Sequence, residues 1–317
     1  MQKPFSSSAA GEANFETTAD VANRIVTTHS RLRVWIKALR VKHWVKNFFV
    51  VAPFLTGTRF GFNEYLLLSI SGAFLFALLS SAVYLFNDII DAPSDRYHPS
   101  KRFRPIASGE ISIVCAASVS LALLIASLGS ASYLDRGFFL LLAAYGVNNL
   151  LYSLYLKRKT VLDVMSIAVG FVIRVYGGGF LIGIEITNWL VACVFALSLF
   201  MGFGKRRAEY EDLQDEACRS RKVHESYTIP KLNILLGISA SVTIVTYMLY
   251  AMAPETKALH STDKLIFTTP FVVYCIYRFL LKVQEEKRGE PTELILKDRG
   301  FILAGSLWLV SILYLTH

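Results

Sequence analysis

The chain has 317 residues, of which 54% are hydrophobic and 18% charged, and its mean hydropathy is +0.45. Soluble domains usually carry about 25% charged residues, so this composition argues against a soluble enzyme and excludes a disordered chain, a coiled coil and a disulfide-stapled secreted domain. The net charge of +9 would indicate nucleic acid in a soluble protein, whereas a membrane protein carries such an excess in its cytoplasmic loops.

The N-terminal segment, residues 1–30, is rich in Ser, Thr and Ala and has no apolar stretch typical of a signal peptide. It is predicted to be a disordered cytoplasmic tail. Apolar residues then recur at helical spacing, with Arg and Lys on the opposite face: Leu32, Trp35, Ile36 and Leu39. This pattern predicts an amphipathic helix on the cytoplasmic membrane surface.

Apolar runs of the length that crosses a bilayer, roughly 20 residues, recur along the rest of the chain. We expect spans at 46–61, 65–86, 111–129, 137–156, 161–183, 188–203, 232–253, 264–281 and 301–316. The first is short and is interrupted by Pro53. Residues 31–317 are therefore predicted to form one all-α, polytopic membrane domain of nine transmembrane helices.

The positive charges predict the orientation of these spans. If the N-terminus is cytoplasmic, 27 of the 33 Lys and Arg residues fall in cytoplasmic segments, four on the other side and two within spans. This asymmetry predicts an N-in, C-out protein of the cell (inner) membrane. Nucleic acid is then not needed to explain the basic charge.

An acidic motif, Asn87-Asp88-Ile-Ile-Asp91-Ala-Pro93-Ser-Asp95, follows the second run. The spacing of Asp88, Asp91 and Asp95 places three carboxylates on one helix face, and Pro93 is expected to end the helix there. Three neighbouring acids repel one another and need a cation, and hard oxygen ligands suit Mg²⁺. Asp88, Asp91 and Asp95 are therefore predicted as the catalytic metal ligands.

Four bases follow the acidic motif within nine residues: Arg96, Lys101, Arg102 and Arg104. A metal-binding acidic face beside a cationic cluster is what a pyrophosphate ester needs; the alternative is a salt-bridged loop without a ligand. A second polar loop follows the sixth run and contains Lys205, Arg206 and Glu209. By itself this second loop would be typical of a positive-inside anchor.

Nine spans and an NDxxDxxxD motif after the second resemble the UbiA superfamily of intramembrane prenyltransferases, from about residue 31 onward. Most members carry a second motif, DxxxD, after the sixth span, where this chain has Lys205, Arg206 and Glu209. The chain is most similar to the decaprenyl-phosphate phosphoribosyltransferase branch, through Trp44-Val-Lys46-Asn47, Lys101-Arg-Phe-Arg-Pro105 and the Gly204-Lys-Arg turn.

That resemblance implies Mg²⁺-dependent transfer of a 5-phosphoribosyl group from phosphoribosyl pyrophosphate (PRPP) to a polyprenyl phosphate of the decaprenyl type, with release of pyrophosphate. It also implies a role in arabinan precursor synthesis for the cell wall. PRPP carries phosphate at both ends, which fits an acidic, metal-binding first loop and a cationic second loop. The resemblance leaves open whether the protein is a homo-oligomer.

Three other functions remain as alternatives. The first is a UbiA-type prenyltransferase that moves a prenyl group from a prenyl diphosphate to an aromatic acceptor. A transporter or channel would carry charges near the membrane midplane, whereas here they cluster at one face. A protein that only binds anionic lipid would not need three Asp residues.

The polar residues near these loops are predicted to bind substrate: Asn87, Lys46, Lys101, Arg102, Arg104, Tyr155, Lys159, Asp163, Lys205, Arg206 and Glu209. Lys46, at the mouth of the first span, is expected to bind the acceptor phosphate. Arg174 lies deep within the fifth span, either as a functional residue or in a structural pair with Glu185 or a backbone carbonyl. Residues 177–179, three consecutive glycines, are expected to allow close helix packing.

Overall fold

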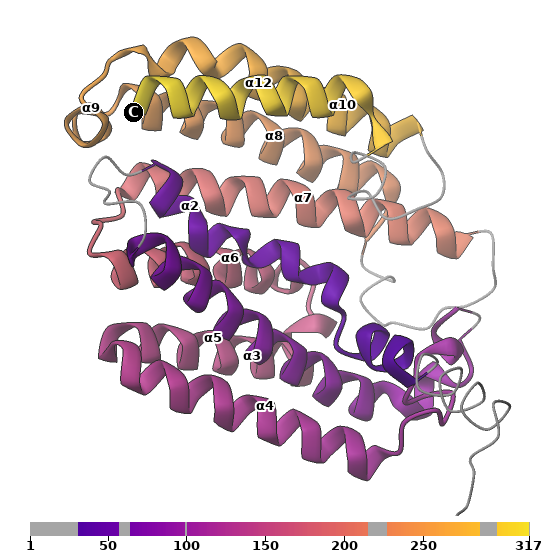
Figure 1. Cartoon of the computed structure of the whole chain (residues 1–317). Helices are drawn as coiled ribbons and strands as arrows, with labels where there is room; N and C mark the ends of the chain where they lie inside the picture. The colour runs from indigo at the N-terminus through magenta and orange to yellow at the C-terminus, as the bar shows by residue number, and fades with distance from the viewer. Residues whose placement is uncertain (1–30, 57–63, 99, 215–226, 286–296, 317) are drawn as a thin grey trace, which may run out of the picture.

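The computed structural model describes residues 31–56, 64–98, 100–214, 227–285 and 297–316, and within these ranges it is all-helical. The predicted tail, residues 1–30, lies outside them. Figure 1 shows long helices stacked side by side. They are η1 (Val41–Asn47), α2 (Phe48–Thr56), α3 (Glu64–Asp95), η2 (Lys101–Phe103), α4 (Ile113–Leu134), α5 (Arg136–Leu154), η3 (Leu156–Arg158), α6 (Leu162–Ile182), α7 (Asn188–Gln214), α8 (Ile229–Met252), α9 (Pro254–His260), η5 (Lys264–Thr268), α10 (Thr269–Glu285) and α12 (Arg299–Thr316).

Eight helices of the described ranges are long and apolar enough to cross a membrane. They coincide with eight of the nine predicted spans, which confirms a polytopic, all-α membrane protein. The remaining predicted span, 46–61, corresponds to η1 and α2, whose helix ends at Thr56. The count of nine and the N-in orientation therefore stay predictions.

The predicted amphipathic helix is present over residues 31–38. It lies against the cluster formed by the end of α3, the 104–111 turn and the start of α4, through Trp35, Ala38 and Leu39. Leu32 and Ile36, which were predicted on the same apolar face, remain 58% and 44% exposed. One edge of the apolar face of this helix therefore packs against the protein, and the other edge is exposed.

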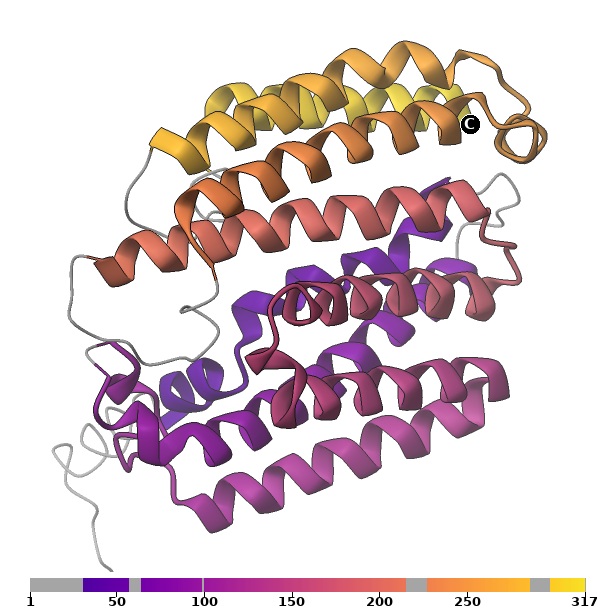
Figure 2. The ribbon, with the colours of Figure 1, turned by 180° about the vertical axis from the view of Figure 1, so that it is seen from behind.

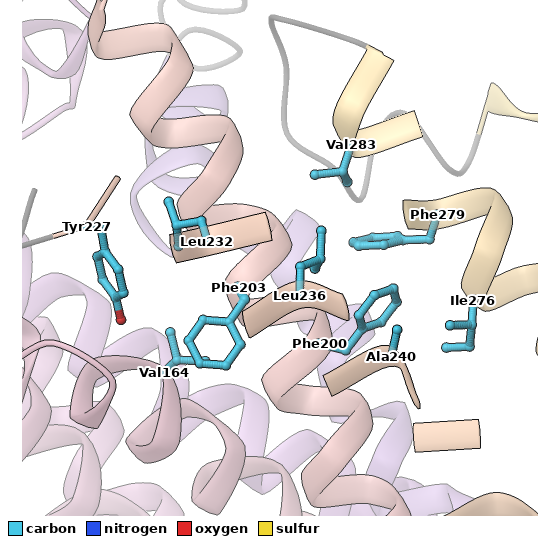
Figure 3. Packing of buried hydrophobic residues seen from close by; sticks show 10 residues of the cluster. All are labelled: Val164, Phe200, Phe203, Tyr227, Leu232, Leu236, Ala240, Ile276, Phe279 and Val283. Carbon is cyan, nitrogen blue, oxygen red and sulfur yellow. The ribbon is translucent and has the colours of Figure 1, made fainter. Parts of the chain in front are cut away.

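Two hydrophobic clusters hold the bundle together, one in each half of the chain. Figure 2 shows the helices of the two halves from behind. The first cluster joins α2, α3 and α5 around Val50, Phe76 and Phe138. The second joins α6, α7, α8 and α10, where the ring centroids of Phe200 and Phe279 lie 4.7 Å apart (Figure 3). Burying such aromatic side chains contributes strongly to packing, and α6 and α7 connect the two halves.

Helices α2 and α6 approach each other through glycine. A Cβ at Gly178 would lie 2.0 Å from the backbone oxygen of Val50 and 3.3 Å from Pro53. Only a residue without a side chain permits this backbone contact. The prediction that residues 177–179 allow close helix packing is thus confirmed at Gly178.

Gly178→Ala is expected to destabilise the protein by about 1–3 kcal/mol, because the added methyl meets backbone that cannot rotate away. The matched control is Gly237→Ala in α8, where a Cβ would meet nothing within 4 Å. The control should be neutral or slightly stabilising, since Ala favours helix over Gly. Thermal unfolding of the purified proteins in detergent measures both, and equal melting temperatures for the two variants would contradict the packing argument.

Candidate active site

The acidic motif lies on the last turns of α3, and not in a loop. The helix runs through Pro93 and ends at Asp95, so the expected end at Pro93 was wrong. A proline removes the hydrogen bond to the carbonyl four residues earlier, but only two helical residues follow it here. Asp88, Asp91 and Asp95 are thus carried by one continuous helix at one end of the bundle (Figure 1).

Asp88 and Asp95 share a cation. One guanidinium nitrogen of Arg104 lies 3.2 Å from Asp88 Oδ1 and 2.6 Å from Asp95 Oδ2, and the two aspartates are 4% and 5% exposed. Arg40 donates a second bond to Asp88 Oδ1 at 2.6 Å and stacks over the Tyr84 ring, 4.5 Å from its centroid. Charge-assisted bonds of this kind are strong, so Asp88 anchors two arginines.

Asp91 has a different partner. Its Oδ1 accepts a hydrogen bond from Lys157 Nζ at 2.8 Å, and Lys157 belongs to η3, between α5 and α6. Neither Arg40 nor Lys157 was singled out in the sequence. Arg40 resembled the polar face of a surface helix, while Lys157 stands beside the predicted Lys159, which the structure leaves exposed.

The three carboxylates do not converge on one point. Within the described residues no group of three or more His, Cys, Asp or Glu side chains is arranged to hold a metal ion. However, the side-chain oxygen of Asn87 is buried and has no hydrogen-bond partner in the described structure, and Asn87 lies one helical turn from Asp91. Buried polar atoms are rarely left unsatisfied, and amide and carboxylate oxygens are ligands for Mg²⁺, which binds one or two protein groups alongside substrate phosphates. The donors of this helix face therefore fit that ion.

The bases after the motif divide into two groups. Arg104 faces the buried carboxylates, whereas Arg102 is exposed and lies over the Phe103 ring at 4.8 Å. Lys101 lies beside it in η2 and is partly buried. The backbone oxygen of Phe103 accepts a bond from Lys37 Nζ at 2.6 Å, which ties this turn to the N-terminal helix.

The second predicted loop is also helical, because α7 continues through it. Arg206 is 5% exposed; it donates to Asp163 Oδ2 at 2.6 Å, to Glu209 and to the Tyr152 hydroxyl at 3.2 Å. Asp163, at the start of α6, is fully buried. A buried ion pair is stable only when such bonds satisfy it. The charge of Arg206 is thus offset by two carboxylates of the protein.

Three other predicted substrate residues, Tyr155, Lys159 and Lys205, are exposed or partly exposed. Tyr155 is 66% exposed at the end of α5, and Lys159 is exposed in the following turn. The Lys205 side chain is 40% exposed, with its Nζ 4.0 Å from Glu209 Oε1. Tyr155 and Lys159 belong to the same short segment as Lys157, which bonds to Asp91 of the acidic motif.

Lys46 lies in η1 between two anchored neighbours. The Trp44 indole donates to Ser81 Oγ of α3 at 3.1 Å, and Asn47 accepts from Arg174 Nε of α6 at 2.9 Å. Arg174 also donates to the Gly170 carbonyl. The structural pairing of Arg174 with a backbone carbonyl is therefore confirmed.

Arg174 is 6% exposed and has no carboxylate partner among the described residues. A third bond goes to the Tyr145 hydroxyl at 2.7 Å, and the guanidinium lies 4.5 Å and 5.2 Å from the ring centroids of Tyr145 and Phe171. Aromatic faces and neutral acceptors thus compensate its charge. The alternative pairing with Glu185 is not observed.

A family model described as the UbiA prenyltransferase family matches residues 48–304. The chain belongs to this family. Over 87% of its length it is similar to the decaprenyl-phosphate phosphoribosyltransferases of Mycolicibacterium smegmatis and Corynebacterium glutamicum, at 34% identity in both cases, covering 90% and 85% of those proteins. This UbiA-family chain is accordingly a membrane-embedded transferase.

Solved structures support the same fold. A UbiA homolog from Archaeoglobus fulgidus bound to DMAPP and Mg²⁺ superposes with a TM-score of 0.68 at 20% identity, covering 89% of this chain and 98% of that one. The same homolog bound to Cd²⁺ gives a TM-score of 0.65. At such identities the likeness concerns the arrangement of the UbiA helices alone.

Proposed function

We propose that this protein transfers the 5-phosphoribosyl group of PRPP to a polyprenyl phosphate of the decaprenyl type, at the cytoplasmic face of the cell membrane. The observation that carries the proposal is an acidic helix end flanked by cations from separate segments, Arg40, Arg104 and Lys157, together with an α7 segment that is cationic where an acidic motif is usual. The names of the relatives that match over most of the chain point the same way.

The diphosphate of the donor would lie at the end of α3. Asn87 and Asp91 are the oxygen donors that would hold Mg²⁺ there, together with donor phosphate oxygens. When bound, this ion would offset the charge of the departing diphosphate. Asp88 and Asp95 are better assigned as the anchors of Arg40 and Arg104, because their bonds go to these arginines and both carboxylates are nearly inaccessible.

The 5-phosphate of the donor would lie on the α7 side of the site. Lys205 and Lys159 supply charge there and Tyr155 a hydroxyl. Arg206, Asp163 and Glu209 fix the segment that carries them, since their charges are satisfied by one another.

The acceptor phosphate would approach from η1, where Lys46 is held between α3 and α6; Lys101 and Arg102 are further candidates for contacts to either phosphate-bearing substrate. An acceptor oxygen forms a bond to C1 of the ribose, the bond from C1 to the diphosphate breaks, and pyrophosphate leaves. The attacking oxygen is already anionic at neutral pH, so no general base is required.

The test is to incubate the purified chain with Mg²⁺, PRPP and a polyprenyl monophosphate and to identify the lipid by mass spectrometry. We expect a lipid heavier by one phosphoribosyl group, and pyrophosphate in equal amount. A parallel reaction contains a prenyl diphosphate and an aromatic acceptor. Turnover in that reaction alone would replace the proposal with aromatic prenylation.

Lys205→Ala is expected to raise KM for PRPP about tenfold with little change in kcat, because one partly screened contact to phosphate is lost in ground and transition state alike. The control is Lys231→Ala, an exposed lysine at the start of α8. Initial-rate kinetics with each substrate varied in turn separates the two constants. An effect confined to the KM of the lipid acceptor would mean that Lys205 binds the other substrate.

A further inference from the structure

The turn that leads into α6 holds a valine in a backbone conformation that valine rarely adopts. Val161 has φ 69° and ψ −45°, and the Leu162 N–H donates to the Thr160 carbonyl at 2.8 Å. This geometry is that of the classic γ-turn, which is rare and strained. A β-branched residue at positive φ is disfavoured further, so the surrounding structure has to hold this turn.

Tyr227, two residues before the start of α8, stabilises this turn. Its hydroxyl accepts a hydrogen bond from the Val161 N–H at 2.8 Å and donates one to Asp163 Oδ1 at 3.0 Å. The ring is 2% exposed and packs in the cluster that contains Val164 (Figure 3). Burial raises the pKa of Tyr227 to about 12, so the hydroxyl keeps its proton and serves as donor and acceptor at once.

The strained turn stands between two parts of the site. Lys157, four residues before Val161, bonds to Asp91, and Asp163, two residues after it, bonds to Arg206. The Val161 carbonyl accepts from Val164 and Met165 at 3.1 and 2.9 Å, so the turn also sets the first residues of α6. Strained backbone that the surroundings stabilise in this way is typical of functional sites.

We propose that Tyr227 is a positioning residue that locks the γ-turn at Val161 and thereby fixes Lys157 and Asp163 for donor binding. The donor-binding part of this inference rests on the proposed function. The effect of the two Tyr227 hydrogen bonds on the backbone of residues 157–163 does not depend on that function.

Tyr227→Phe removes both hydrogen bonds and keeps the ring. The matched control is Tyr247→Phe, within α8 and about 27 Å from the first residue of that helix by helix rise; Tyr247 is also buried, and its hydroxyl also makes two bonds, to Thr268 and Trp308. Both variants are expected to lose similar stability. Only Tyr227→Phe should raise KM for PRPP, about tenfold for two lost bonds, with KM for the lipid unchanged.

Hydrogen exchange gives a readout that needs no activity. Amides of residues 157–163 should exchange faster in Tyr227→Phe and at the wild-type rate in Tyr247→Phe. Equal exchange of this segment in both variants, or an unchanged KM for PRPP in folded Tyr227→Phe, overturns the inference. If the wild-type protein forms no product from PRPP, the proposed function fails, while the exchange data still test whether Tyr227 stabilises the turn at Val161.

A second substitution tests the strain directly. Glycine adopts positive φ without steric cost, so Val161→Gly should keep the turn even when the Tyr227 hydrogen bonds are lost. The double variant Tyr227→Phe/Val161→Gly is expected to recover most of the PRPP affinity that Tyr227→Phe loses. If Tyr227→Phe alone does not accumulate, the double variant carries the test. A folded double variant whose KM for PRPP remains about tenfold raised contradicts the proposal.

Discussion

Asp91→Asn is expected to lower kcat/KM about a thousandfold, which corresponds to the several kcal/mol that a bound metal ion contributes to a developing negative charge. The substitution keeps the shape and one oxygen of the side chain but removes the charge that holds the ion. It should not unfold the protein, because the Asp91 side chain is 24% exposed and its partner Lys157 is itself partly accessible. Initial rates over a Mg²⁺ titration, with a melting temperature for each variant, measure both effects.

The Mg²⁺ titration also separates Asp91 from Asp88. Asp91→Asn should shift the Mg²⁺ concentration for half-maximal rate upward, whereas Asp88→Asn should lower kcat and stability without that shift, because it releases Arg40 and Arg104. Glu110→Gln, an exposed carboxylate near the same end of the bundle, is the control and should behave like the wild type. An unchanged rate in Asp91→Asn would contradict a role of Asp91 in holding the metal ion.

The second large effect concerns the buried ion pair of α6 and α7. Arg206→Met is expected to destabilise the protein by about 3–5 kcal/mol, because it leaves the fully buried carboxylate of Asp163 without its cation. Adding Asp163→Asn removes that stranded charge, and the double variant should regain a large part of the loss. Equilibrium unfolding in detergent measures Arg206→Met, Asp163→Asn and the double variant.

Non-additivity is the decisive feature of that comparison. If the double variant is as unstable as the sum of the single variants predicts, the two residues are not coupled. Both Arg206→Met and the double variant should be poor enzymes, since the segment that carries Lys205 loses its anchor. The double variant should therefore regain stability without regaining activity. A pair that only stabilises the fold would regain both together.

The membrane spans and the acidic motif could be predicted from the sequence, because they depend on local properties. Eight spans follow from length and apolar composition alone, and the spacing of Asp88, Asp91 and Asp95 fixes their place on one helix. The predicted span at 46–61 was harder to place, since α2 is short and contains Pro53. The end expected at Pro93 was wrong because a proline near the end of a helix costs little.

The partners of the motif could not be predicted, because they come from remote segments and look ordinary in the sequence. Arg40 is 48 residues and Lys157 66 residues from the carboxylate it binds. Arg206 was expected to contact phosphate, but Asp163, 43 residues away, offsets its charge. Tyr227 belongs to no motif, and its hydrogen bonds to Val161 and Asp163 become visible only in the structure.

The proposed donor carries phosphate at both ends. The most direct measurement compares KM for PRPP with KM for ribose 1-diphosphate, which lacks the 5-phosphate, in the wild-type protein and in Lys205→Ala. We expect the KM for the analogue to be about tenfold or more higher than that for PRPP in the wild type. Lys205→Ala should raise the KM for PRPP alone and so reduce this difference. Equal KM values for the two donors in the wild-type protein would contradict the assignment of a 5-phosphate site.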